Sequence, residues 1–211
     1  FKVNINTGTY KSITKGISTT DEGLWHSPLE IYVNGRYLYH GRSALYVSID
    51  KGESWDVMAK GTANKISAIG VSQIDEFVVY CGYNNGDVTV STDGGENWEK
   101  VSSNGLINRY VTSIVCSENE PSTAFITYSG FGTPHVYKTT NFGESWQNIS
   151  DGLPDAPCNS LAIHPYKTDD NTLFVASDVG VFCTIDGGQN WFPYGKNLPR
   201  SPIVDLSFHT N

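Results

Sequence analysis

The stretch Ser91-Thr92-Asp93-Gly94-Gly95-Glu96-Asn97-Trp98 is one of four copies of a motif that repeats without gaps along the chain. The other copies run over Ser48–Trp55, Thr139–Trp146 and Thr184–Trp191, and all four fit Ser/Thr-x-Asp/Asn-x-Gly-x-x-Trp. Their third positions lie 43, 48 and 45 residues apart, at Asp50, Asp93, Asn141 and Asp186. Self-similarity at a period of this length predicts a repeat architecture.

Each copy has the composition of a tight β-hairpin. The Asp or Asn side chain accepts hydrogen bonds from backbone N–H groups of the turn, and the Gly supplies a positive φ angle. The tryptophan then returns on the second strand and covers the apolar side of the hairpin; these residues are Trp55, Trp98, Trp146 and Trp191. We therefore expect a structural role for the motif, and a loss of about 3–5 kcal/mol in Trp98→Ala, typical of a buried aromatic side chain.

The segments between the motifs repeat one strand order. In the second repeat, strands are expected over residues 66–71, 76–81 and 87–90, and in the fourth over 160–163, 172–176 and 181–183. A fifth, degenerate copy opens the chain at residues 4–10, with Asn6 in the third position and Tyr10 in place of the tryptophan. Four antiparallel strands every 43–48 residues predict an all-β fold, a β-propeller of four-stranded blades.

On these motifs the chain resembles the Asp-box (bacterial neuraminidase repeat) β-propeller superfamily, which includes sialidases, xyloglucanase-type glycosidases, sortilin ectodomains and a photosystem assembly factor. We call the four motif copies the Asp-box hairpins. Enzymes and non-enzymes share this fold, so the resemblance fixes the architecture and leaves the function open.

The domain organisation is read as a single propeller segment over residues 1–211, with about four full blades from Pro28 to Leu198. Residues 1–17 are expected to end a preceding blade, and residues 202–211 to form the first strand of a following one. The two ends could meet in a fifth blade that closes a ring. The favoured alternative is a part of a larger propeller of six to eight blades, or of a multidomain parent, because the family usually has more blades.

Composition excludes several classes of function. The net charge of −8 argues against a nucleic-acid partner, and no apolar run is long enough for a membrane span. The histidines and cysteines lack metal-ligand spacing, and no cofactor-binding motif is present, so neither metal nor cofactor is expected. The four cysteines are expected to be buried thiols; Cys116 and Cys158 are the pair to test for a disulfide.

The resemblance implies two kinds of active site. Sialidases clamp a substrate carboxylate with three arginines, whereas this chain has only four arginines and lacks the family's Arg-Ile-Pro signature. Xyloglucanase-type enzymes carry a catalytic Asp in a Thr-Asp-Val/Ile-Gly turn, which places Asp178 of Ser177-Asp178-Val179-Gly180 as a weak catalytic candidate. The following Val181 departs from the family pattern, and Asp205 and Glu30 are only guesses for a second carboxylate.

Aromatic residues near turns suggest a second kind of site. Trp25, Tyr83, Tyr128 and Phe131 are the candidates for a ligand-binding face, since aromatic platforms with few charges suit sugars or peptides. Packing between blades is the competing explanation for these side chains.

The sequence thus favours a non-catalytic binding or scaffolding module of a secreted or surface protein, with protein or carbohydrate as its partner. The alternative is a fragment of a glycoside hydrolase, of sialidase or xyloglucanase type, whose active-site residues lie mostly outside this chain.

Overall fold

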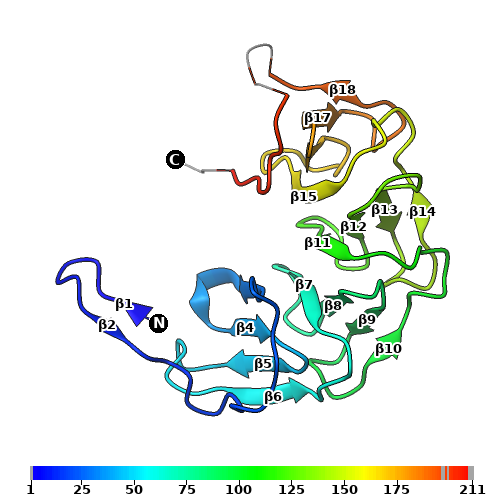
Figure 1. The fold of residues 1–211 in the computed structure, drawn as a ribbon. Coiled ribbons are helices and arrows are strands. Elements are labelled where there is room, and N and C mark those ends of the chain that lie inside the picture. Colours follow the sequence, from blue (N-terminus) through cyan, green and yellow to red (C-terminus); the bar gives the residue numbers. More distant parts are fainter. Residues whose placement is uncertain (1, 196–197, 199, 209–211) are drawn as a thin grey trace.

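The computed structural model describes residues 2–195, 198 and 200–208. It contains four four-stranded antiparallel sheets and one two-stranded sheet, and a single short 3₁₀ turn, η1 (Val33–Gly35), interrupts the β-structure of this part of the chain. Figure 1 shows the four larger sheets standing side by side around an axis, each with its first strand innermost. The expected β-propeller fold is confirmed, and the arrangement is open on one side in this view.

The blades follow the repeat in order. The first blade consists of β3 (Leu29–Ile31), β4 (Leu38–Gly41), β5 (Leu45–Ser48) and β6 (Asp56–Ala59). The second consists of β7 (Ile66–Val71), β8 (Val79–Tyr83), β9 (Val88–Ser91) and β10 (Glu99–Lys100). The third consists of β11 (Val111–Cys116), β12 (Ala124–Tyr128), β13 (Val136–Thr139) and β14 (Gln147–Asn148). The fourth consists of β15 (Cys158–Ile163), β16 (Leu173–Ser177), β17 (Gly180–Thr184) and β18 (Phe192–Pro193).

Each Asp-box hairpin connects the third and fourth strands of its blade and is closed by its own side chains. In the first hairpin, Asp50 Oδ1 accepts bonds from the Ser54 N–H (2.9 Å) and the Ser48 hydroxyl (2.8 Å), while Ser48 Oγ accepts from the Gly52 N–H (2.8 Å). The other three hairpins repeat this pattern. The shared glycine has a positive φ in every copy, for example 86° at Gly52, which L-residues rarely adopt.

The tryptophans join each hairpin to the chain before it. Trp55, Trp146 and Trp191 are buried, and the indole N–H groups of Trp55 and Trp191 donate to the Ile13 and Ile149 carbonyls at 2.7 Å. Trp98 differs, because it is only half-buried and bonds to the Gly95 carbonyl of its own hairpin.

Apolar side chains fill the spaces between neighbouring blades. One cluster lies between the first and second blades, a larger one between the second and third, and another between the third and fourth. Within an inner strand such as β7, Ile66, Ile69 and Val71 enter these clusters. The stability of the fold therefore comes from contacts between repeats, as in other repeat proteins.

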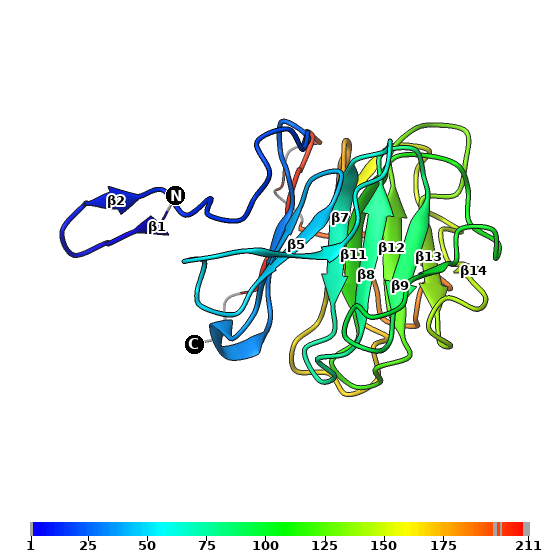
Figure 2. The same ribbon diagram turned by 90° about the horizontal axis from the view of Figure 1, so that it is seen from below.

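The two ends of the described chain differ in how they contact the blades. β1 (Lys2–Val3) and β2 (Tyr10–Lys11) form a hairpin that projects from the blades in Figure 2. In this degenerate copy the turn is closed by Asn4, whose Oδ1 accepts from the N–H groups of Asn6 and Thr7. Residues 13–17 follow, and Ile13 and Ile17 pack on the first blade beside Trp55 and Tyr46.

Residues 203–206 lie along β15 without forming a regular strand. The Ile203 N–H donates to the Ser177 carbonyl at 3.0 Å, and the Leu206 N–H donates to Ser160 Oγ at 3.3 Å. The segment thus takes the place that the inner strand of a following blade would have. Residues 1 and 209–211, which belong to the expected terminal strands, lie outside the described residues.

All four cysteines are free thiols, and the pair Cys116–Cys158 suggested by the sequence is not formed. Cys116 ends its inner strand and Cys158 begins the next one, and the inner strands run in the same direction. Five residues of extended chain separate those levels by about 16 Å along the axis, which is beyond the reach of a disulfide.

Candidate functional site

The inner strands of the blades line a polar channel at the axis. Side chains on one side of each strand enter the apolar clusters, while Ser67, Thr112, Ser113, Asn159 and Ser160 face the channel region. The channel holds two adjoining hollows of about 200 and 260 Å³. Both are bordered by residues of all four blades and by Asp205 of the C-terminal segment.

A repeated hydrogen bond joins neighbouring inner strands and fixes the channel wall. In the second and third blades, the second residue of the inner strand donates its side chain to the carbonyl of the first residue of the next inner strand: Ser67 to Val111 (2.7 Å) and Thr112 to Cys158 (2.6 Å). Asn159 continues the series by donating its amide to the Ile203 carbonyl at 2.9 Å. Ile203 therefore takes the register of a fifth inner strand.

Two carboxylates border both hollows, Glu30 on β3 and Asp205 on the C-terminal segment. Asp205 is held by the Ser160 hydroxyl (3.0 Å) and by the Leu206 N–H (2.8 Å). Glu30 stays accessible to solvent, yet the protein that surrounds the channel partly desolvates its carboxyl group. This desolvation, followed by the negative charge of Asp205, raises the pKa of Glu30 to about 7.

Asp178 lies in the turn between β16 and β17 and borders neither hollow of the channel. Its Oδ1 accepts a hydrogen bond from the Asn159 amide at 2.9 Å, so it is connected to the channel through one side chain. The two carboxylates guessed from the sequence, Glu30 and Asp205, share the channel with each other and leave Asp178 outside it. Proximity of these two ends of the chain carries no local sequence signal, so sequence reasoning did not pair them.

Of the four aromatic candidates for a ligand-binding face, two are buried and two are exposed. Tyr83 and Tyr128 are buried, with 6% and 0% of their surfaces exposed, and belong to the clusters between blades. They are core residues and cannot contact a ligand, which corrects the expectation of one aromatic face. Trp25 and Phe131 are exposed at 94% and 62%.

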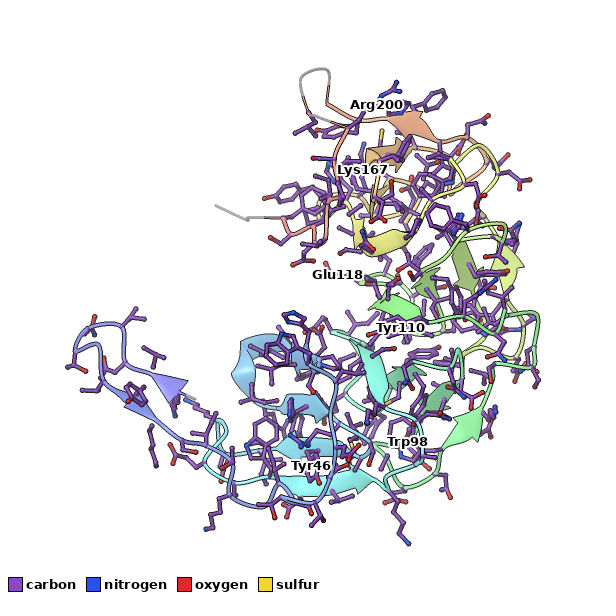
Figure 3. All side chains as sticks on the ribbon, viewed as in Figure 1. Tyr46, Trp98, Tyr110, Glu118, Lys167 and Arg200 are labelled. Carbon is purple, nitrogen blue, oxygen red and sulfur yellow. The ribbon has the colours of Figure 1, made fainter. Side chains whose placement is uncertain are left out.

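The arginines do not gather into a clamp. Arg36 forms an ion pair with Glu76 at 3.1 Å. Arg42 lies in the turn between β4 and β5 and donates to the Asp21 backbone carbonyl. Arg109 is exposed in the segment entering the third blade, and Figure 3 shows Arg200 beyond the fourth blade. Among the described residues, no group of three or more His, Cys, Asp and Glu side chains is placed to hold a metal ion.

The family follows from a match over more than half of the chain. A family model described as Sortilin-Vps10 (Sortilin, neurotensin receptor 3) matches residues 43–153. The chain belongs to the Sortilin-Vps10 family. The matched part of this Sortilin-Vps10 chain starts in the first blade, contains the second and third, and ends before β15. No curated protein matches its sequence.

Several solved structures share the fold of this Sortilin-Vps10 chain. An ancestral GH74 enzyme superposes with a TM-score of 0.66 at 18% identity, covering 87% of this chain and 25% of the enzyme. The GH74 xyloglucanase from Xanthomonas campestris gives 0.63 at 17%, covering 80% and 30%. YCF48 from Cyanidioschyzon merolae gives 0.64 at 15%, covering 92% and 63%.

At these identities the likeness concerns the fold alone. The Sortilin-Vps10 chain spans less than two thirds of each of these proteins. In the part of the chain that the structure describes, no helix has the length and apolar character needed to cross a membrane.

Proposed function

We propose that this Sortilin-Vps10 propeller is a non-catalytic binding or scaffolding module whose ligand, a protein segment or a carbohydrate, enters the central channel. The observation that carries this proposal is the channel itself, which hydroxyl, amide and carboxylate side chains of all four blades border. Such a wall offers hydrogen-bond donors and acceptors to an elongated polar ligand. The carboxylate of Asp178, the candidate for catalysis, accepts a hydrogen bond from the Asn159 amide, and Asp178 does not border the hollows of the channel.

A substitution that narrows the channel and leaves the apolar clusters between blades unchanged tests this proposal. Val204 is 76% exposed and borders one hollow, so Val204→Trp adds bulk at the axis. Purified protein is screened against fluorescent decapeptides and β-glucan oligosaccharides, and bound probes are titrated against both forms. We expect Val204→Trp to weaken binding at least tenfold, whereas Val57→Trp, 55% exposed on β6, leaves it unchanged. Binding that Val204→Trp does not alter, or no binding to either probe set, would refute the proposal.

The channel carboxylates favour glycoside hydrolysis as a second candidate. A carboxyl group with a pKa near 7 that shares a channel with a second carboxyl group is the kind of arrangement that supplies a general acid and its partner. If this second function holds, purified protein cleaves β-glucan or sialoside oligosaccharides, and Glu30→Gln and Asp205→Asn each abolish turnover. If the binding proposal holds, no turnover is detected and Glu30→Gln still binds its probe.

We further propose that the chain is part of a larger propeller or multidomain protein. The low coverage of the structural relatives supports this, as do Leu29 and Ile31 of β3, which are exposed at 56% and 53%. The corresponding residues of the second blade, Ile69 and Val71, are covered by the blade before them. The sequence of the parent gene tests this directly, since it either adds Asp-box repeats or does not.

A secreted or surface location is proposed with it. Three of the thiols, Cys81, Cys116 and Cys158, are buried, and burial raises the pKa of each. Thiols of this kind stay unreactive, so the free cysteines are compatible with an oxidising compartment. Fractionation of the source cells, with an antibody against the chain, would place the protein inside or outside the plasma membrane.

A further inference from the structure

A separate hollow of about 240 Å³ opens between the third and fourth blades, at the end of the molecule that carries the Asp-box hairpins. It lies between the loop that follows β11 and the loop that follows β15. The polar and aromatic side chains that line it belong to Glu118, Asn119, His164, Tyr166, Lys167 and Thr168. Figure 3 shows Glu118 beside the axis near the boundary of the two blades and Lys167 on the fourth blade.

A buried network holds the two loops in place. Asp170 is 5% exposed and accepts hydrogen bonds from the Ser117 hydroxyl and from the Asn119 amide, the latter at 2.6 Å. Ser117 Oγ in turn accepts from the N–H groups of Asn119 (2.9 Å) and Glu120 (3.0 Å). The bonds to Asp170 connect the loop of the fourth blade to the loop of the third. Because they hold both loops in place, the hollow is formed before any ligand arrives.

Two charged side chains at the hollow, Glu118 and Lys167, are free to bind a ligand. Within the described residues, neither Glu118 nor Lys167 has an ion-pair partner, and both are exposed. Tyr166 is 69% exposed, and its ring stands edge-on to His164 with 6.0 Å between the ring centroids. The site therefore combines an acceptor, a donor, the Thr168 hydroxyl and an open aromatic ring.

We propose that this hollow binds one neutral sugar ring, such as the terminal residue of a glycan. The hydroxyl groups of a sugar both donate and accept, which suits Glu118 and Lys167 together, and its C–H face suits the open ring of Tyr166. The volume equals that of about eight water molecules, enough for one ring but not for an oligosaccharide. Glu118 and the net charge of −8 disfavour an anionic ligand such as a phosphate.

This inference goes beyond the proposed channel function, because the hollow is a second site that needs no ligand at the axis. Glucose, galactose, mannose and N-acetylglucosamine are added separately to ¹⁵N-labelled protein, and amide chemical shifts are followed. We expect saturable shifts with at least one sugar, at millimolar affinity, confined to residues 117–120 and 163–168. Tyr166→Ala and Lys167→Met should each weaken binding about tenfold.

Two variants serve as matched controls. Phe77→Ala removes an exposed aromatic ring and Lys60→Met an exposed lysine, both away from the hollow, and neither should change the affinity. Val204→Trp should also leave sugar binding intact, which separates this site from the channel. The proposal is wrong if none of the four sugars gives saturable shifts, if the shifts fall elsewhere, or if Tyr166→Ala and Lys167→Met bind as the unaltered protein does.

Discussion

Asp50 and Asn141 occupy the same position in two hairpins whose other contacts match, so they show what the charge adds. Asp50 accepts from the Ser54 N–H and hydroxyl, whereas Asn141 accepts from the Ser145 N–H and donates its amide to the Ser145 hydroxyl. The hydrogen bonds from Ser54 and Ser48 lower the pKa of Asp50 to about 2. Charge therefore affects the response to acid, while either side chain closes the turn.

Exchange between these two hairpins gives a prediction at the same scale. The pKa of Asp50 is about 2 in the folded chain and about 3.9 in the unfolded one, so its stabilisation is complete above pH 4 and is lost as pH falls toward 2. Asp50→Asn should flatten the dependence of the melting temperature on pH between 4 and 2. Asn141→Asp should steepen it. Thermal unfolding at a series of pH values checks this, and parallel curves for all three forms would contradict it.

At the scale of the element, Trp191 connects a hairpin to the strand end of the blade before it. Its indole is 6% exposed and donates to the buried Ile149 carbonyl. Trp191→Ala should therefore cost about 3–5 kcal/mol of unfolding free energy, and Trp191→Phe about 1–3 kcal/mol, since the carbonyl is left unpaired. Urea unfolding followed by circular dichroism measures both. Trp98→Ala is the comparison; because Trp98 is half-buried, its cost should be clearly smaller than that of Trp191→Ala.

The second blade, which carries Trp98, shows how closely the sequence could predict the strands. The repeat gave the strands of the second blade to within three residues: 66–71, 76–81 and 87–90 were expected, and β7, β8 and β9 were found. β8 starts later because residues 72–78 form a turn, in which Ser72 Oγ and the Asp75 carbonyl accept from the backbone. The difference between Trp98 and Trp191 could not be predicted, because it depends on which carbonyl of a neighbouring segment each indole reaches.

The candidate site was predictable only in its parts. Glu30 and Asp205 were only guesses for a second carboxylate, and their meeting at the axis depends on how four blades place the C-terminal segment. The hollow beside Lys167 depends likewise on Asp170, a buried residue in the left-handed region (φ 50°) whose partners Ser117 and Asn119 lie on the neighbouring blade. The repeats are visible as a pattern in the amino-acid sequence, whereas the contacts between repeats leave no local pattern there.

At the scale of the whole molecule, the described residues leave the face of the first blade that carries Leu29 and Ile31 without a neighbouring blade. Leu29 and Ile31 are exposed at 56% and 53%, whereas the residues at the same register in the second and third blades are covered: Ile69, Val71, Ile114 and Cys116. An apolar face that elsewhere in the same molecule always packs against another blade is a surface for association. Because the complementary face belongs to a different part of the chain, contact between copies would be head-to-tail.

The expected behaviour of the isolated chain follows from this face. Sedimentation velocity should show the weight-average mass rising with protein concentration, because each copy can cover part of this face on another. Leu29→Lys combined with Ile31→Lys should suppress the rise by adding charge where a blade would pack. Val57→Lys, which adds one lysine at an exposed apolar residue of β6 outside this face, should not. A mass independent of concentration in the unaltered chain, or equal suppression by Val57→Lys, would show that the open face of the first blade does not drive association.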